Sequence, residues 1–359
     1  MNGTSVSKRK VHIDIFRFIA MFLVMYCHTG DRAVNHYHIP GSKISLLLCI
    51  AARVFAIASP SMYFFISGGL LLSKEESIKD VLKKRVLRYV IVMIVFKAFQ
   101  LVYLLMTNPE YAANPAYKTN PVRTVFNILY SQDVVTQYWF IHAYLAFLLL
   151  LPILRILAQN MKDRHFMYLL MLFFILNVGL VIIEYFLKLD RIDLSISIFE
   201  EILFYPLVGY FIISRLGDRV NNKKFLTYLN ISGFMLYIFD VYYGYRNYAE
   251  GNGPHLITGL VPLWAIIIYC DIKYLCDKTD LGSRKFSGFI SFCAAASLVT
   301  YLLDPQLHRI TEIVYDKTYL KITWFPAAVL WCFSALAIGI VIGWILRQIP
   351  YVGKLFGAK

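Results

Sequence analysis

Apolar residues fall into ten segments along the chain, each close to the length of a membrane-spanning helix and separated from the next by a more polar connection. A helix of about 20 apolar residues crosses the hydrocarbon core of a bilayer. The pattern therefore predicts an all-α, polytopic membrane protein with about ten transmembrane helices, built as one integral-membrane domain over residues 1–359. The segments are 12–28, 45–72, 87–106, 137–157, 166–187, 197–213, 225–243, 256–272, 286–303 and 322–346.

Composition supports this fold class, since 59% of the residues are hydrophobic, the mean hydropathy is +0.60 and only 16% are charged. A soluble domain of this length could not bury so much apolar surface. The first segment is not followed by a small-residue cleavage pattern, so we expect a retained helix and not a signal peptide. The six cysteines lack C-x-x-C spacing and predict small core residues, with no disulfide framework and no metal site.

Basic residues alternate along the chain and predict how it crosses the membrane. The chain has 36 lysines and arginines. Of these, 23 lie in the two terminal stretches and in every second connection between segments, 10 lie in the remaining connections, and 3 lie within segments. Positive residues concentrate on the cytoplasmic side, so both termini are expected there. The net charge of +14 follows from this rule and from the binding of basic loops to anionic lipid. We therefore do not expect nucleic acid to be a partner.

Two segments depart from simple spans. Residues 45–72 are too many for one straight crossing, and Ser59-Pro60 in their middle predicts a kink, because proline removes a backbone hydrogen bond. The connection 107–136 is the longest on the outer side, and it is either a lid over an outer cavity or a solvated connector.

The first segment carries the most informative polar residues. Asp14 and Arg17 are one turn apart, and eleven residues separate Arg17 from His28, which is three turns plus about 20°, so all three share a helix face. Arg17 and His28 are roughly 16 Å apart along the axis. Ionisable residues inside a membrane are costly and indicate function by default. The expected topology places His28 near the outer end of this helix and residues 83–88 at the cytoplasm.

Four motifs in this order resemble the acyltransferase-3 membrane proteins, which are bacterial enzymes that use cytoplasmic acyl-CoA to acylate cell-surface carbohydrates. They are the Asp-x-x-Arg-x10-His pattern of Asp14, Arg17 and His28; Arg53 to Pro60 followed by Phe64-Phe65-Ile-Ser67-Gly68-Gly69; Lys84-Arg85-Val-Leu-Arg88; and Trp139-Phe140 through Leu151-Pro152-Ile-Leu-Arg155. The resemblance implies a multi-pass O-acyltransferase of the bacterial cell membrane. It would use acetyl-CoA without a metal and acylate a hydroxyl of a glycan, peptidoglycan or glycolipid; a homo-oligomer is possible.

The resemblance also implies roles for residues. His28 would be the proton acceptor, because an imidazole near neutral pKa suits that task. Arg17 either pairs with Asp14 or binds the donor. Arg53 has three alternatives: it stabilises the carbonyl oxygen, it binds an acidic acceptor, or it forms a structural ion pair with Glu200, Glu201 or Asp240. Lys84, Arg85 and Arg88 are expected to bind the donor. Ser67 and Gly68 are expected to allow a close approach of the backbone to the donor or to a neighbouring helix. Trp139 and His142 are expected to bind the acceptor.

Several points stay open in the sequence. Glu200 or Asp240 could orient His28, whereas Cys27 should point about 100° away from His28 and is a poor candidate nucleophile. Asp304 stands in Tyr301-Leu-Leu-Asp304 where the family often has histidine, which leaves the role of that position in doubt. The alternatives to an enzyme are a transporter of a small solute such as serine and a non-catalytic partner in surface-polymer assembly.

Overall fold

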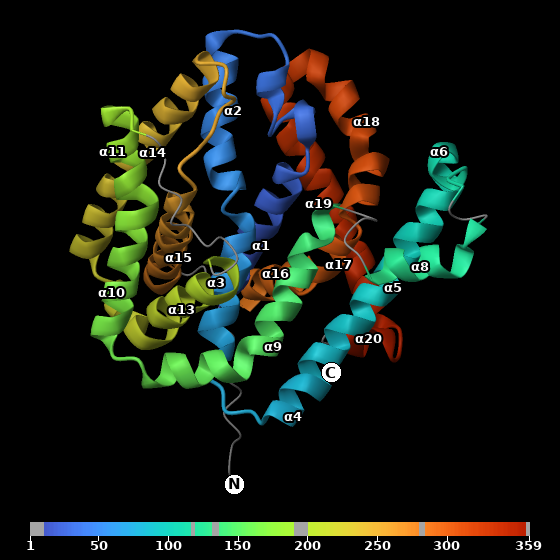
Figure 1. Ribbon diagram of the computed structural model, residues 1–359, viewed down its shortest axis with the longest axis horizontal. Coiled ribbons are helices and arrows are strands. Elements are labelled where there is room, and N and C mark those ends of the chain that lie inside the picture. The colour runs from blue at the N-terminus through green and yellow to red at the C-terminus, as the bar shows by residue number, and fades with distance from the viewer. Residues whose placement is uncertain (1–10, 116–118, 131–135, 190–199, 280–283, 357–359) are drawn as a thin grey trace.

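The computed structural model of the protein describes residues 11–115, 119–130, 136–189, 200–279 and 284–356 (Figure 1). All regular structure in these ranges is helical, which confirms the all-α prediction. Helix α1 (Val11–Cys27) runs through the middle of the bundle and packs against α3 (Ser59–Leu71), α15 (Val261–Lys278), α16 (Arg284–Ala295) and α19 (Trp324–Gln348). The polar residues of α1 are therefore enclosed by other helices.

Seven helices in the described ranges are long and apolar enough to cross a membrane, and a bent pair would make an eighth. Large apolar side chains such as Ile94, Phe99 and Phe234 are exposed on their outer faces, as expected where lipid replaces water. The protein is therefore a multi-pass membrane protein. The count of ten crossings remains a prediction, because α1 and the helical stretch 200–216 are not among these helices. The side on which the termini lie also remains a prediction.

The helix is interrupted where the kink at Ser59-Pro60 was predicted. Helix α2 (Lys43–Ala56) ends just before it and α3 begins at Ser59, with the proline in the first turn, where its missing N–H costs nothing. The Ser59 hydroxyl donates to the Ala56 carbonyl over 2.8 Å, which satisfies a backbone group freed by the break.

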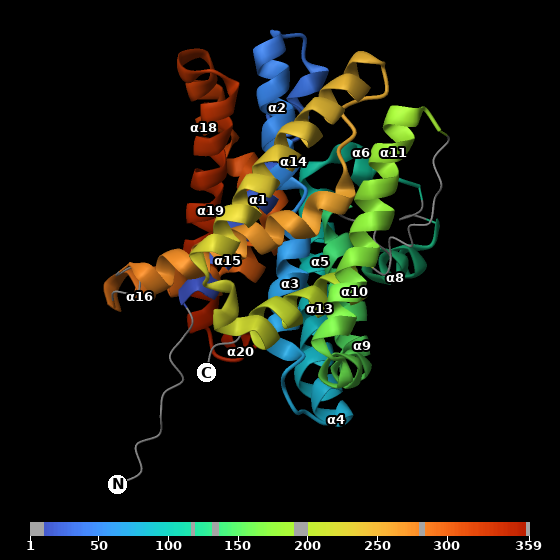
Figure 2. The same ribbon diagram turned by 90° about the vertical axis from the view of Figure 1, so that its left-hand side faces the viewer.

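A second break lies at Leu303, where the segment predicted over 286–303 ends, and residues 304–321, which were expected to be a connection, instead belong to a helix. Helix α17 (Ser297–Leu302) ends at this break and α18 (Asp304–Ile322) begins directly after it. The axis of the helical stretch Phe286–Leu302 makes an angle of 100° with the axis of α18. Figure 2 shows α16 lying across the bundle while α18 runs along it. The Leu302 carbonyl at the break accepts from Tyr138 Oη at 2.6 Å and from Gln100 Nε2 at 3.2 Å, so the bend is held by two neighbouring helices.

Helices α3 and α13 (Tyr205–Tyr210) cross with their backbones in close contact. A Cβ added to Gly68 would lie 1.9 Å from the Pro206 carbonyl oxygen, and one added to Gly209 would lie 1.8 Å from the Phe65 oxygen. Small residues allow such close packing of helices in membranes. The structure therefore assigns Gly68 to helix packing, the alternative left open beside donor binding.

The remaining helices complete the bundle around this centre. In the long connection 107–136 the described residues include two short helices, while residues 116–118 and 131–135 lie outside the described ranges, so its role as a lid stays a prediction. The other elements are η1 (Gly30–Arg32), η2 (His36–His38), α4 (Ile78–Val81), π-helix η3 (Leu82–Val86), α5 (Leu87–Thr107), α6 (Pro109–Ala112), α8 (Pro121–Tyr130), η4 (Thr136–Tyr138), α9 (Trp139–Asn160), α10 (Asp163–Phe174), η5 (Ile175–Gly179), α11 (Leu180–Leu187), η6 (Glu200–Phe204), η7 (Phe211–Leu216), η8 (Gly217–Val220), α14 (Lys223–Ala249), η9 (Thr258–Leu260) and α20 (Val352–Leu355).

Candidate active site

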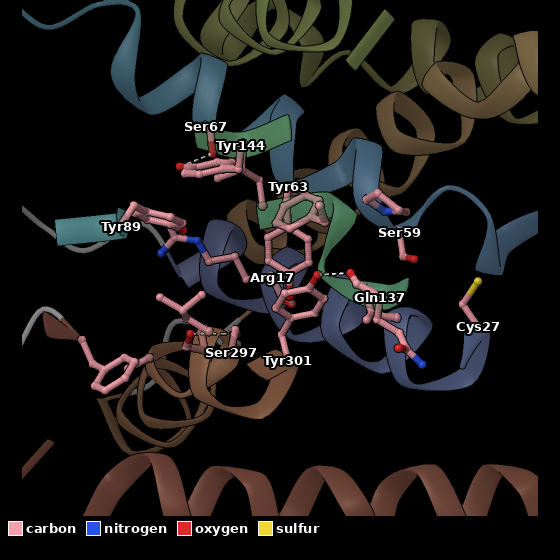
Figure 3. A pocket seen from close by; sticks show the side chains of 18 of the residues that line it. Arg17, Cys27, Ser59, Tyr63, Ser67, Tyr89, Gln137, Tyr144, Ser297 and Tyr301 are labelled. Atoms are coloured by element: carbon pink, nitrogen blue, oxygen red, sulfur yellow. Dashed lines mark hydrogen bonds between the residues drawn. The ribbon is translucent and has the colours of Figure 1, made fainter. Parts of the chain in front are cut away.

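A cavity of about 420 Å³ lies inside the bundle beside α1 (Figure 3). Its walls come from α1, α3, α5, α9, α16, α17 and α19, and they combine aromatic rings with a few polar groups. We call the end of the bundle at which α1 begins and α19 ends the basic end, because η3 with Lys83, Lys84 and Arg85 lies there. In Figure 3 the Arg17 side chain extends toward Tyr89, and Cys27 lies on the far side of the cavity.

His28 borders the cavity, and its imidazole is held by Asp304. The Nδ1 atom of His28 lies 2.6 Å from Asp304 Oδ2, and Asp304 is completely buried. A carboxylate can only accept a hydrogen bond, so Nδ1 carries the proton in this contact and the lone pair of Nε2 stays available. This is the arrangement in which a carboxylate fixes the tautomer and orientation of a histidine general base.

The bend between α17 and α18 brings Asp304 to His28. Asp304 begins α18 with Pro305 directly after it, and the 276-residue separation from His28 is closed only in the folded chain. Asp304 is therefore the acidic partner that the sequence analysis sought in Glu200 or Asp240. Asp240 instead accepts the Ile257 backbone N–H at 2.7 Å, and the side chain of Glu200 lies outside the described set.

A second buried histidine stands behind Asp304. His308 Nδ1 lies 2.9 Å from Asp304 Oδ1 and 3.2 Å from the Asp304 carbonyl oxygen, one turn earlier on α18. Its ring packs edge-on against Trp331, with the ring centroids 4.8 Å apart. His308 thus lies within ion-pair distance of the second carboxylate oxygen, although that oxygen makes no hydrogen bond with any described residue.

Arg17 borders the same cavity toward the basic end. Its Nη1 lies 3.6 Å from Asp14 Oδ1, which is longer than a good charge-assisted hydrogen bond. Asp14 is almost fully buried and accepts the Ser291 hydroxyl at 2.6 Å through its other oxygen. Both roles expected for Arg17 are compatible with this geometry, because the side chain keeps a loose ion pair with Asp14 and also borders the cavity.

The basic residues of η3 and α5 that were predicted to bind the donor differ in their partners. Arg85 holds Glu76 through two bonds, Nε to Oε2 at 2.9 Å and Nη2 to Oε1 at 2.6 Å. Arg155 from α9 adds a third at 2.7 Å to Oε2. Arg85, followed by Arg155, lowers the pKa of Glu76 to about 2, against the opposing effect of its partial burial. Arg85 is therefore neutralised by the Glu76 carboxylate, for which the sequence motifs give no signal.

Arg88 differs from Arg85 in having no such partner among the residues that the structure describes. Its Nε atom is buried without a hydrogen bond, and its charge lies within electrostatic reach of Tyr89 and Tyr144, which both border the cavity. Lys84, by contrast, is 71% exposed and paired with Asp80 at 2.8 Å, away from the cavity lining. None of the three basic residues predicted to bind the donor borders the cavity, and Arg88 is the one without a carboxylate partner among the described residues.

The other predicted site residues separate into two groups. Trp139 and Ser67 border the cavity, and the Ser67 hydroxyl lies 3.0 Å from Tyr144 Oη. Arg53 instead donates to the Val34 carbonyl at 3.4 Å and to the Asn35 side chain. His142 lies with Nε2 3.0 Å from Lys97 Nζ and is not part of the lining. Arg53 and His142 are turned toward neighbouring segments, which is why the depth expected from the sequence did not bring them to the cavity.

Cys27 also departs from its expected position. The 100° rotation per residue predicted that it would face away from His28, yet both border the cavity. The His28 N–H still donates to the Val24 carbonyl as in a helix, so the cavity lining takes in a wide sector of this end of α1, from Val24 to Cys27 and His28.

The chain matches the family of acyltransferase domains over residues 11–344, which is nearly its whole length. No curated protein and no solved structure gives a significant match. The family match gives no support to the transporter alternative. The match begins at the start of α1 and ends within α19, so it includes most of the cavity lining, whereas Arg347 and Phe356 lie beyond its last residue. Because this match covers nearly the whole chain, the chain belongs to the acyltransferase-3 family and is a membrane acyltransferase.

Proposed function

We propose that the protein is an O-acyltransferase that moves an acyl group, in the first instance acetyl, from cytoplasmic acyl-CoA to a hydroxyl of a cell-surface glycan, peptidoglycan or glycolipid. The acyl-CoA enters from the basic end, and the acceptor meets it at His28 on the opposite side of the cavity. The proposed setting is the bacterial cytoplasmic membrane, with both termini inside the cell.

The observation that carries this proposal is the spacing of charge along the cavity. Arg17 and His28 are roughly 16 Å apart along α1. In CoA, about thirteen bonds join the sulfur to the nearer phosphorus of the pyrophosphate. An extended chain advances about 3.6 Å for every three bonds, so this arm has a reach of about 15 Å. A pyrophosphate beside Arg17 would therefore place the thioester beside His28.

Charge complementarity agrees with an anionic donor. Arg17, His28 and Arg347 are the ionisable side chains with basic character in the lining, and no carboxylate is among the described residues that form it. Guanidinium groups bind phosphate through several parallel hydrogen bonds. Aromatic residues such as Tyr63, Tyr89 and Phe140 supply the apolar walls along which a pantetheine arm could lie.

In the proposed reaction His28 Nε2 takes the proton of the acceptor hydroxyl as its oxygen attacks the thioester carbonyl carbon. The new C–O bond forms, the C–S bond breaks, and the sulfur leaves as a thiolate that recovers the proton from His28. Asp304 keeps Nδ1 protonated throughout and stabilises the positive charge that the imidazole carries between the two transfers. A positioned general base of this kind contributes on the order of 10²–10⁴-fold to rate.

The test is to follow both halves of the donor with purified protein in vesicles. Acetyl-CoA labelled on the acetyl group is supplied at the basic side, and free thiol and label bound to cell-envelope glycans are measured together. The proposal predicts equal amounts of both, dependent on added acceptor. Absence of thiol release with acetyl-, succinyl- and longer acyl-CoAs would overturn it.

A further inference from the structure

Arg347 is a cavity residue whose position the family motifs do not mark. It lies in the last turn of α19, and its side chain borders the same cavity as Arg17, although 330 positions separate them in the chain. From the sequence it counted only as one of the basic residues expected at the cytoplasmic ends of helices. Its presence in the lining gives the cavity a second guanidinium.

The depth of Arg347 follows from the way α19 packs on α1. The rings of Phe22 and Phe333 lie 4.6 Å apart, and those of Tyr26 and Phe325 lie 6.2 Å apart, so the two helices run in opposite directions. Arg17 precedes Phe22 by about 8 Å along its axis, whereas Arg347 follows Phe333 by about 21 Å along its own. The backbone of Arg347 is thus roughly 13 Å nearer the basic end than that of Arg17.

Arg347 makes no hydrogen bond and no ion pair with any residue that the structure describes. Arg85 presents the opposite case, because Glu76 occupies its guanidinium fork. A partly buried guanidinium that borders an elongated cavity without a carboxylate partner is suited to an anionic ligand.

The segment after Arg347 holds this residue in place. Tyr351, with a φ of 67°, turns the chain into α20, and Phe356 then borders the cavity while packing on Phe96 at 5.9 Å. Helix α20 contacts both α19 and α5, so the end of α19 is fixed between two neighbours (Figure 1). Arg347 therefore approaches the cavity from a supported element.

We propose that Arg347 binds the 3′-phosphate of the CoA donor. This inference rests on the proposed function. With the thioester at His28 and the pyrophosphate at Arg17, the adenosine half of the donor extends further toward the basic end, where Arg347 lies. Arg347 then acts as a specificity residue: it favours CoA over thioester donors that lack the 3′-phosphate, such as an acyl group on a phosphopantetheine arm.

The experiment measures equilibrium binding of CoA and of 3′-dephospho-CoA to the full chain in lipid nanodiscs. Arg347→Gln should weaken CoA binding by about ten- to a hundred-fold, the value of one or two charge-assisted hydrogen bonds. It should leave 3′-dephospho-CoA binding within about twofold of wild type, since that ligand lacks the phosphate. Arg347→Lys should retain part of the preference for CoA.

Lys354→Gln is the matched control, because Lys354 lies on α20 close by, is exposed and does not border the cavity. Unchanged CoA binding in Arg347→Gln, or equal losses for both ligands, would overturn the assignment of the 3′-phosphate. Wild-type protein that binds neither ligand would instead overturn the proposed function itself, so the two failures are distinguishable.

Discussion

At the scale of single residues, the contact of His28 with Asp304 organises the site. Replacing Asp304 by Asn keeps the shape but removes the charge that holds the imidazole tautomer, so we expect turnover to fall by on the order of 10²–10⁴-fold while donor affinity stays the same. Single-turnover thiol release, measured beside donor binding, checks this. Asp316→Asn on the same helix, an exposed carboxylate paired with Arg32 at 2.6 Å, is the control. A loss of less than threefold in Asp304→Asn would show that Asp304 does not serve His28.

The sequence indicated half of this pair. His28 and Arg17 could be found from their spacing on one helix, because that geometry is local. Asp304 could only be noted as a departure from a family pattern, since its contact depends on a 100° bend and a partner 276 residues away. Pro305 in the first turn of α18 was the available signal, because proline at this position commonly marks the start of a helix.

At the scale of elements, the crossing of α3 and α13 should tolerate no side chain. Gly68→Ala places a Cβ against the Pro206 backbone, which cannot move cheaply, and should destabilise the protein by about 1–3 kcal/mol. Gly288→Ala on α16 is the control, because nothing lies within 4 Å of its added Cβ and alanine favours the helix by up to about 1 kcal/mol. Thermal unfolding in detergent compares the two. Equal unfolding temperatures would contradict the close approach.

The carboxylate of Glu76 ties η3 to α9 and predicts a dependence of stability on pH. Its folded pKa of about 2 lies below the ordinary value of 4.5, so the stabilisation is fully present above pH 4.5 and is lost as the pH falls toward 2. The difference in unfolding temperature between wild type and Glu76→Gln should therefore be largest at neutral pH and shrink between pH 4.5 and 3. Lys84→Gln, which removes an exposed ion pair, should change little. A difference that grows on acidification would contradict the arrangement.

Elements with strong local signals were predictable, and those shaped by packing were not. Proline at position 60 predicted the break between α2 and α3 correctly. The segment 197–213 read as a span because it is apolar, yet most of the described part lies buried between other helices and is interrupted by two π-helical stretches. Apolarity identifies burial but does not distinguish a lipid-facing helix from one enclosed by protein.

At the scale of the whole molecule, the account requires the two ends of the bundle to face opposite sides of the membrane. Position 74 is close to Glu76 at the basic end. Position 252 lies at the other end, just after Tyr248, whose hydroxyl donates to the Tyr37 carbonyl. In intact cells, cysteine at position 252 should react with a membrane-impermeant maleimide, and cysteine at position 74 should react only after lysis. Wild type serves as the control for the six native cysteines. The reverse labelling pattern would place the donor entrance on the wrong side.

The central claim is that His28 catalyses acyl transfer inside this cavity from a donor bound toward the basic end. The most direct measurement is single-turnover thiol release from acetyl-CoA in vesicles with acceptor present, using His28→Ala and, as the matched control, His38→Ala, an exposed histidine outside the cavity paired with Asp31. The account predicts that His28→Ala binds the donor as tightly as wild type but releases thiol at least a hundredfold more slowly, whereas His38→Ala matches wild type. Thiol release by His28→Ala at the wild-type rate would contradict it.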